Sequence, residues 1–122
     1  MIKDLNIQMT LRGIDGEKYL FNVYEYDNFD DLDNCFKAIP AIYAFSHRYK
    51  DIENKYKHHL IYLGETGDLS QRFQNHHKKE CINKRKGNCI WIYVTSEDEN
   101  IRKSEEKNIL DFNDFPCNIQ NN

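Results

Sequence analysis

The sequence predicts an α+β domain, in which a small, mostly antiparallel β-sheet is flanked by helices and extended by an N-terminal β-hairpin. Apolar segments of strand length recur along the chain, and helix-capping residues precede two more polar segments. The length of 122 residues suits one domain with a single modest core, and an aromatic content of 13% argues against disorder.

The chain opens with two expected strands. Residues 7–11 and 19–26 are rich in β-branched and aromatic side chains, and residues 13–17 between them contain two glycines and an aspartate. This pattern is typical of a β-hairpin. Tyr19, Phe21 and Val23 are expected to share one side of the second strand.

An acidic segment, residues 27–33, follows the hairpin and is expected to be a solvated connector. A metal-binding interpretation of its aspartates is weaker, because the glycine and the distal glutamate of a calcium loop are missing. We therefore expect residues 1–40 to form a hairpin and connector packed on a domain formed by residues 41–122.

Three further strands are predicted at residues 41–46, 60–63 and 89–95, and the last of these is apolar enough to be central in the sheet. In the first of them, Ile42 and Ala44 should point to one face and the two aromatic residues to the other. Residues 48–57 are expected to be a polar loop.

The segment after residue 63 is expected to form a helix capped by Asp68. Leu69 and Phe73 are four residues apart and would form its buried face, while Arg72 and His76 would project from the border of that face. A second short helix is expected over residues 80–86. Ser96 and Glu99 fit a capping box for a final helix that reaches about Phe112.

The four cysteines, Cys35, Cys81, Cys89 and Cys117, form no C-x-x-C pair. We expect free thiols in a reducing compartment. A zinc site is a weaker alternative; it would use His76, His77, Cys81 and Cys89. No apolar run approaches the length of a membrane span and residues 1–4 begin no signal peptide, so we expect a cytoplasmic protein.

Charge is distributed unevenly along the chain. The net charge is -3, but residues 41–86 carry 10 basic and 5 acidic side chains, whereas residues 1–40 carry 4 and 8 and residues 87–122 carry 3 and 7. A basic patch beside an acidic remainder indicates local phosphate binding, although a solvated, lysine-rich helix end would give the same pattern.

Five short motifs occur in a defined order: Ala41-Ile42-Tyr43, Tyr62-Leu63-Gly64, Arg72 with His76, Glu106, and Pro116-Cys117-Asn118. In this combination the chain resembles the GIY-YIG nuclease family from about residue 40 to residue 118. Ala41 and Leu63 depart from the family motif, but both changes are small, apolar and distant from the tyrosine hydroxyls.

The resemblance implies a GIY-YIG-like fold and a set of catalytic residues: Tyr43, Tyr62, Arg72, His76, Glu106 and Asn118. Tyr43 would act as general base, and Glu106 would hold a single Mg²⁺ or Mn²⁺. Helical periodicity alone favours Glu105 as the buried neighbour of Ile101, Ile109 and Phe112. The resemblance favours Glu106, because it precedes the closing asparagine by the twelve residues usual in the family.

The expected activity is metal-dependent hydrolysis of phosphodiester bonds in DNA; RNA stays open as a second substrate. Contacts to the nucleic acid would come from Arg72, His77, Lys78, Lys79, Lys84, Arg85 and Lys86. The alternative is a catalytically inactive module that binds nucleic acid or protein. A homodimer, or a partner protein bound through the N-terminal hairpin, is compatible with the sequence.

Overall fold

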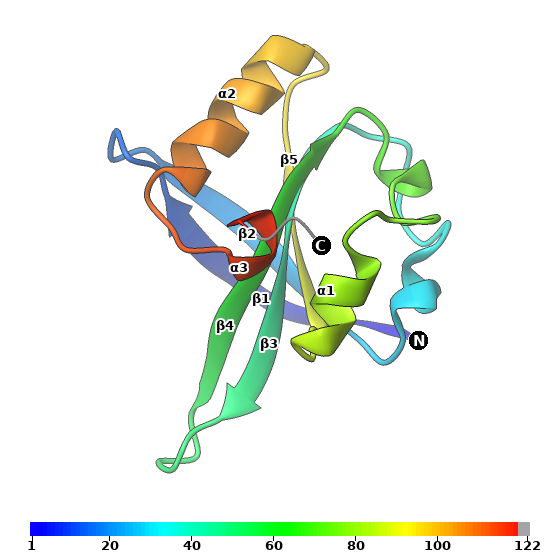
Figure 1. Ribbon diagram of the computed structural model, residues 1–122, viewed down its shortest axis with the longest axis vertical. Coiled ribbons are helices and arrows are strands. Elements are labelled where there is room, and N and C mark those ends of the chain that lie inside the picture. Colours follow the sequence, from blue (N-terminus) through cyan, green and yellow to red (C-terminus); the bar gives the residue numbers. More distant parts are fainter. Residues whose placement is uncertain (120–122) are drawn as a thin grey trace.

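The computed structural model describes residues 1–119 and has an α+β fold built on one antiparallel sheet (Figure 1). The five strands are ordered β1-β2-β5-β3-β4. Their bounds are Ile2–Arg12 (β1), Lys18–Tyr26 (β2), Ala41–Lys50 (β3), Tyr56–Thr66 (β4) and Cys89–Val94 (β5). The predicted fold class is therefore confirmed, and the N-terminal hairpin belongs to the main sheet because β2 pairs with β5.

Short helices flank this sheet on both faces (Figure 1). Their bounds are Phe29–Leu32 (η1, 3-10), Leu69–Gln71 (η2, 3-10), Lys79–Lys84 (α1), Glu99–Leu110 (α2) and Pro116–Ile119 (α3). The acidic connector is thus not wholly solvated, since its η1 segment buries Phe29 and Leu32.

Both faces of the sheet are covered, so β3 is apolar on each side. Tyr43 and Phe45 belong to a core cluster with η1, η2 and α1, which we call the tyrosine face. Ile42 and Ala44 belong to a second cluster that includes Ile109 of α2, which we call the α2 face. The alternation predicted for β3 is confirmed, because neighbouring side chains of a strand point to opposite faces.

The helix predicted after Asp68 is wrong in length. Asp68 does cap this segment, since its side chain accepts a hydrogen bond from the backbone N–H of Ser70. Helical structure nevertheless ends after one 3-10 turn, and Asn75 adopts a left-handed conformation with φ of 50°. Leu69 and Phe73 are buried as expected. Local turn geometry therefore replaces the helix before α1 begins.

The polar loop predicted for residues 48–57 is also wrong. β3 and β4 continue to pair as far as Lys50 opposite Tyr56, and only a short turn joins them. In this turn Asp51 accepts hydrogen bonds from the backbone N–H groups of Glu53 and Lys55. Cross-strand hydrogen bonds satisfy the backbone N–H and C=O groups of this segment. Its side chains are too polar for the segment to be recognised as a strand from the sequence. We call residues 47–59 the arm.

The last helix begins two residues later than predicted, with its N-cap at Asp98 in place of Ser96. Asp98 is the N-cap of α2, and Ser96 instead accepts a hydrogen bond from the backbone N–H of Asp98. Ile109 is buried, but Ile101 and Phe112 are about half exposed, so the apolar face predicted for this helix is incorrect. Its inner side is partly polar, which makes hydrophobic periodicity a poor guide to its orientation.

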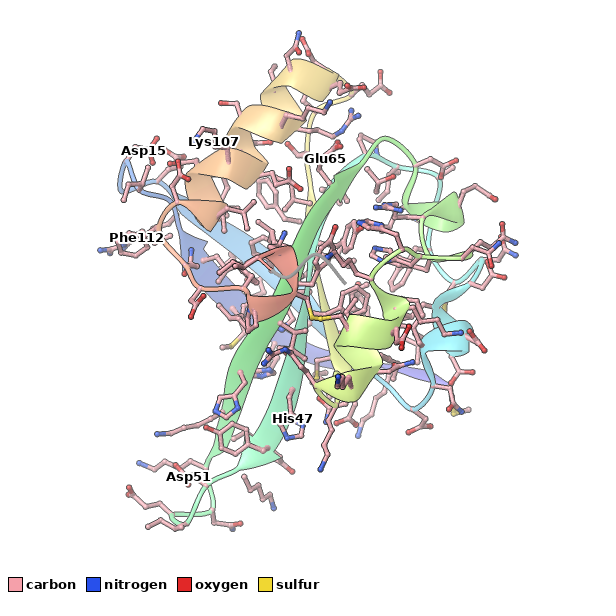
Figure 2. The ribbon with its side chains drawn as sticks, in the orientation of Figure 1. Asp15, His47, Asp51, Glu65, Lys107 and Phe112 are labelled. Atoms are coloured by element: carbon pink, nitrogen blue, oxygen red, sulfur yellow. A yellow bond between two sulfur atoms is a disulfide. The ribbon has the colours of Figure 1, made fainter. Side chains whose placement is uncertain are left out.

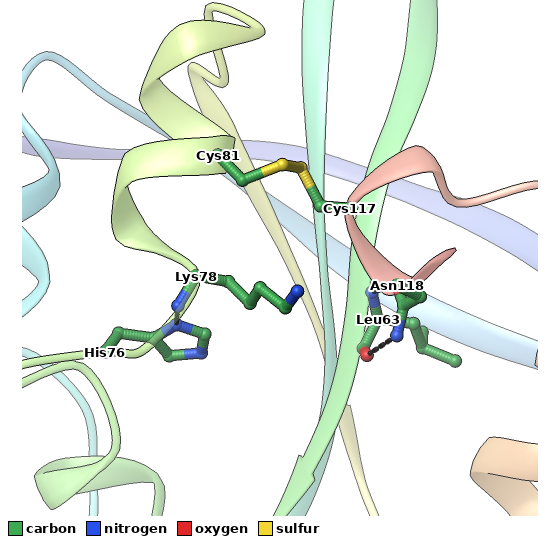
Figure 3. The surroundings of a disulfide bond; sticks show 6 residues. All are labelled: Leu63, His76, Lys78, Cys81, Cys117 and Asn118. Carbon is green, nitrogen blue, oxygen red and sulfur yellow. Dashed lines mark hydrogen bonds between the residues drawn. A yellow bond between two sulfur atoms is a disulfide. The ribbon is translucent and has the colours of Figure 1, made fainter. Parts of the chain in front are cut away.

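The prediction of four free thiols is incorrect. Cys81 of α1 and Cys117 of α3 form a disulfide with their Cα atoms 6.0 Å apart (Figure 3). Cys35 and Cys89 are the free cysteines of the described chain. Sequence spacing did not reveal the pair, because 36 residues separate the two cysteines and only the fold brings them together. Within residues 1–119 no helix is long and apolar enough to cross a membrane.

Candidate active site

The ladder between β3 and β4 sets the position of the first tyrosine. Tyr43 lies opposite Gly64 and is fully buried. A Cβ atom at Gly64 would lie 2.5 Å from the Tyr43 hydroxyl oxygen, well inside contact distance. Gly64 is therefore required for space: without a side chain there, the phenol can lie flat across β4.

His76 holds the Tyr43 hydroxyl from the turn before α1. The Nε2 atom of His76 lies 2.8 Å from the Tyr43 hydroxyl oxygen, and its Nδ1 atom accepts a hydrogen bond from the backbone N–H of Lys78 at 3.0 Å. Burial, together with the charge of Arg72 and the nearby His77, lowers the pKa of His76 to about 3. The ring is therefore neutral, and because Nδ1 accepts, Nε2 carries the proton and donates to Tyr43.

Aromatic rings enclose this pair. The Tyr62 ring centroid lies 6.2 Å from that of Tyr43 and 5.4 Å from that of His76. Phe29 of η1 contacts His76 at 5.9 Å. This last contact is not predictable from the sequence, because Phe29 reaches the site through the fold of the acidic connector. The result is a dry environment around two tyrosine hydroxyls and one imidazole.

Arg72 supplies the positive charge beside the tyrosines. Its guanidinium carbon lies 5.8 Å from the centre of the Tyr43 ring. Burial raises the pKa of Tyr43 well above its ordinary value and also raises the pKa of Tyr62, while Arg72 lowers both. Burial prevails, so both side chains are neutral phenols at neutral pH.

Glu106 projects from α2 and is half-buried. Burial and the nearby Glu65 raise its pKa to about 7, against the opposing charges of Lys103 and Arg72. Glu106 in turn raises the pKa values of Tyr43 and Tyr62, so the carboxylate acts on the same two hydroxyl groups. A carboxylate with such a pKa takes up either a proton or a cation near neutral pH.

The neighbouring carboxylates all have partners. Glu65 accepts a hydrogen bond from Nε of the buried Arg102 at 2.8 Å, and Glu105 accepts one from the Thr95 hydroxyl. Within residues 1–119 no hydrogen bond or ion pair is made to Glu106. Glu65 and Arg102 are site residues that sequence reasoning missed; the only signal was a glutamate directly after Tyr62-Leu63-Gly64.

A divalent cation fits this arrangement. Within residues 1–119 no three His, Cys, Asp or Glu side chains gather to hold a metal ion, and the zinc alternative fails because Cys81 is in the disulfide. A hard ion such as Mg²⁺ keeps most of its water and needs as little as one carboxylate from the protein. Glu106 is the carboxylate that has the raised pKa and no competing partner.

Asn118 contacts the backbone of β4. Its side-chain amide donates to the Leu63 carbonyl and accepts from the Leu63 N–H, both at 2.8 Å (Figure 3). Leu63 lies between Tyr62 and Gly64 on β4, and among residues 1–119 no strand pairs with the outer edge of β4. Asn118 therefore caps this edge and holds β4 in register, which is a positioning role.

The predicted nucleic-acid contacts divide into two groups. His77 stacks on His76, with ring centroids 4.9 Å apart, and Lys79 forms an ion pair with Asp30 at 2.6 Å. Lys78 extends from the start of α1 beside His76 (Figure 3). The other three cations lie at the far end of α1 and line an open depression of about 760 Å³; they are Lys84, Arg85 and Lys86.

Comparisons of this chain with protein-family models, with curated proteins and with solved structures found no match. A function must therefore be argued from the geometry of the site.

Proposed function

We propose that this chain is a metal-dependent endonuclease of the GIY-YIG type, which hydrolyses phosphodiester bonds in DNA. The observation that carries the proposal is the Glu106 carboxylate, half-buried, with a pKa raised to about 7 and set against two buried tyrosines and an arginine. A set of side chains with this composition suits a phosphate group and a hard cation.

Arg72 would bind the non-bridging phosphate oxygens, because its guanidinium is permanently charged and planar. Glu106 would hold Mg²⁺ or Mn²⁺, which when bound supplies Lewis-acid stabilisation of charge on the phosphoryl oxygens. Tyr62 would orient the phosphate or the attacking water from the neighbouring strand. Asn118 would keep Tyr62 and Gly64 in register through Leu63.

Tyr43 would act as general base only after its pKa falls. The Nε2–H of His76 already donates to the hydroxyl oxygen and stabilises the phenolate, and Arg72 acts in the same direction. Further positive charge brought to the pocket would complete the shift. This tautomer favours His76 as a hydrogen-bond donor that polarises Tyr43 over His76 as a proton shuttle.

A non-cutting module that binds nucleic acid or protein is the second candidate. The full burial of Tyr43 favours it, because a base must reach the proton that it abstracts. Glu106 argues against a non-cutting module, because its half-buried carboxylate has no hydrogen-bond or ion-pair partner within residues 1–119. Burial of such a group is unfavourable, and a module that only binds gains nothing from it.

Nicking of supercoiled plasmid tests the two candidates. The purified chain is assayed with Mg²⁺ or Mn²⁺, with EDTA, and as the variants Glu106→Gln and Glu99→Gln. Glu99 is the matched control, because it lies on the same helix but is exposed in a surface ion pair with Lys103. We expect Glu106→Gln to lose at least about a hundredfold in nicking rate and Glu99→Gln to keep it.

Other outcomes would contradict parts of the proposal. Loss of nicking in Glu105→Gln but not in Glu106→Gln would move the metal ligand to Glu105. Binding of DNA by the wild-type chain without cleavage of supercoiled, branched or single-stranded substrates would favour the non-cutting module.

A further inference from the structure

Three rings beside the candidate active site form a series of nearly parallel planes. The rings of Phe73 and His76 are inclined by 19° with centroids 6.2 Å apart, and those of His76 and His77 by 17° with centroids 4.9 Å apart. Phe73 and His76 are buried, whereas His77 is exposed. The series therefore begins in the core of the tyrosine face and ends at the surface on an exposed ring.

The exposed ring of His77 adjoins the groups that would act on a phosphate. Its centroid lies 6.0 Å from that of Tyr62, and the His76 ring next to it is hydrogen-bonded to the Tyr43 hydroxyl. Burial, together with the charges of Arg72 and Lys78, lowers the pKa of His77, so its imidazole is neutral at neutral pH. A neutral imidazole attracts a phosphate less than a cation does, and its face offers a surface on which another ring can stack.

A surface hollow of about 890 Å³ lies beside this ring. It follows one side of α1, because its lining residues recur every three or four positions from His76 to Lys84. Its far end lies toward the base of the arm, since Nδ1 of His47, labelled in Figure 2, donates to the Lys86 carbonyl just after α1. In addition to His76, the hollow is lined by Asn75, His77, Lys79, Glu80, Asn83 and Lys84.

The polar groups of the hollow include both donors and acceptors. The carboxamides of Asn75 and Asn83 each donate and accept hydrogen bonds, and the Glu80 carboxylate accepts them. Within residues 1–119 these three side chains form no hydrogen bond or ion pair, and all three are exposed. The edge of a nucleic-acid base also presents donors and acceptors, whereas a phosphate presents acceptors alone.

The charges of the hollow nearly balance. Lys79 forms an ion pair with Asp30 at 2.6 Å, which leaves Lys84 and Glu80 with opposite charges. A carboxylate in the wall repels a phosphate, so this hollow differs from the basic depression at the end of α1. Its composition favours a base over the sugar-phosphate backbone.

We propose that this hollow binds an unpaired base of the DNA strand being cut, stacked on His77 and held at its edge by Asn75 and Asn83. The inference rests on the proposed function, because it takes DNA as the ligand and places the scissile phosphate beside Tyr43. In a duplex both faces of a base are covered by its neighbours. A base can stack on a protein ring only where it is unpaired or has left the stack.

The substrate class follows from this requirement. The DNA would carry an unpaired nucleotide next to the scissile phosphate, as single-stranded and branched DNA do, and an intact duplex would have to extrude a base. Stacking tolerates every base, since each has a flat face, so the hollow would select the structure of the DNA more than its sequence.

Fluorescence anisotropy in EDTA tests the proposal without requiring cleavage. The labelled probes are a single strand of about 20 nucleotides, a blunt duplex of about 20 base pairs, and the same duplex with a single-stranded flap. They are titrated with the wild-type chain, His77→Ala and Phe112→Ala. Phe112→Ala is the matched control, because it also removes an exposed ring, at the end of α2 (Figure 2).

We expect His77→Ala to bind the single strand and the flap about 5- to 100-fold more weakly than the wild type, which corresponds to the loss of one stacked base. Binding of the blunt duplex should be unchanged, and Phe112→Ala should follow the wild type on all three probes. The slope of log K against log salt should also be unchanged in His77→Ala, because a stacked base releases no counterions. A slope that falls by ~0.7 on the single strand would identify a phosphate contact and overturn the proposal.

Two further variants separate stacking from charge and from a loss of folding. His77→Phe keeps a flat ring and should restore most of the affinity for the single strand, whereas His77→Lys supplies a charge without a ring and should not. Restoration by His77→Lys and not by His77→Phe would overturn the proposal. Thermal unfolding of each variant shows that the chain is folded when it is assayed.

The outcomes also distinguish this inference from the proposed function. Equal binding of the single strand by His77→Ala and the wild type would overturn the base site alone. A selective loss in His77→Ala without nicking in Mg²⁺ would overturn the enzyme but keep the base site. No DNA binding by the wild type would overturn both.

Discussion

β3 and β4 pass through two contrasting environments along one ladder. At one end, Tyr43 and Gly64 are enclosed by helices and rings, and the tyrosine hydroxyl is held by His76. At the other end, Lys50 and Tyr56 are exposed on a ribbon. The buried end can shift pKa values, because burial removes water from ionisable groups, whereas the side chains at the other end stay in contact with water.

Under the proposed function, this contrast would separate two tasks. Chemistry on a phosphate requires a dry pocket with groups fixed to within fractions of an ångström, whereas attraction of a polyanion requires exposed charge along its length. One pair of strands can serve both tasks, because β3 and β4 extend beyond the other strands of the sheet and are covered by helices at one end only. The disulfide and the helices on either side of β4 lie where the buried end of the β3–β4 ladder passes into the exposed end.

The largest expected effect comes from the disulfide beside the buried end. Cys81 and Cys117 close a loop of sequence separation 36, and loop-closure entropy gives about 4 kcal/mol for a loop of this size. Cys117→Ser should lower the free energy of unfolding by about this amount, measured by urea denaturation. Asn118, one residue away, would be less firmly held on Leu63.

Cys35→Ser is the matched control for that variant, because Cys35 is an exposed free thiol. It should unfold at the wild-type urea concentration, and adding a reductant should affect the wild type but not Cys117→Ser. Equal stabilities of the wild type with and without reductant would contradict the role given to the disulfide.

Gly64→Ala should be next in size. The added methyl group would lie 2.5 Å from the Tyr43 hydroxyl oxygen, so the ring must move away from His76. Overpacking of this kind costs about 1–3 kcal/mol, and nicking should be lost even where the chain still folds. Thermal unfolding and the plasmid assay measure the two effects.

Gly67→Ala is the control for Gly64→Ala, because it adds the same methyl group to another glycine of this segment. A Cβ there would lie 3.3 Å from one terminal nitrogen of Arg102, a contact that is relieved by a movement of a few tenths of an ångström. We expect a loss below about 1 kcal/mol. A larger loss from Gly67→Ala than from Gly64→Ala would refute the close fit of Tyr43 against β4.

A third prediction concerns pH. The pKa of Glu106 is raised to about 7 in the fold, above its ordinary value, so the contribution of this group to stability is present at low pH and is lost as the pH rises through 7. In the absence of metal, Glu106→Gln should therefore be more stable than the wild type at pH 8 and equal to it at pH 4. Because the group is partly exposed to solvent, the difference should be on the order of 1 kcal/mol.

Urea titrations in EDTA at the two pH values measure this difference. Addition of Mg²⁺ at pH 8 should stabilise the wild type and not Glu106→Gln, since only the carboxylate binds the ion. A pH-independent difference between the two proteins would show that Glu106 ionises normally.

The sequence predicted best where local pattern and burial agree. Alternation in β3 gave both of its faces, and the near-continuous apolar run at residues 89–95 gave the central strand β5. The motif tyrosines and His76 do converge. Misses occurred where long-range contacts decide: the arm forms by cross-strand pairing of polar residues, and the two disulfide cysteines meet only in the fold.

Local backbone geometry explains the other misses. The left-handed Asn75 ends the helix expected after Asp68, and this turn, not helical spacing, sets the position of His76. The sequence does not single out Glu65, because a glutamate at a strand end is usually solvated. Its place beside Glu106 depends on the buried Arg102, which joins α2 to β4.

The smallest expected effect lies in the arm. Tyr56 is 54% exposed, and its ring carries the guanidinium of Arg48 at 3.6 Å. An exposed cation–π contact contributes about 0.5–1 kcal/mol, so Tyr56→Ala should lower the free energy of unfolding by no more than that. Phe112→Ala is the control, because Phe112 is 51% exposed and has no such partner among the described residues. A loss within this range would show that the arm adds little to the stability of the domain. A loss of stability as large as that from Gly64→Ala would mean that the arm is a structural part of the domain, and the contrast between the two ends of the ladder would fail.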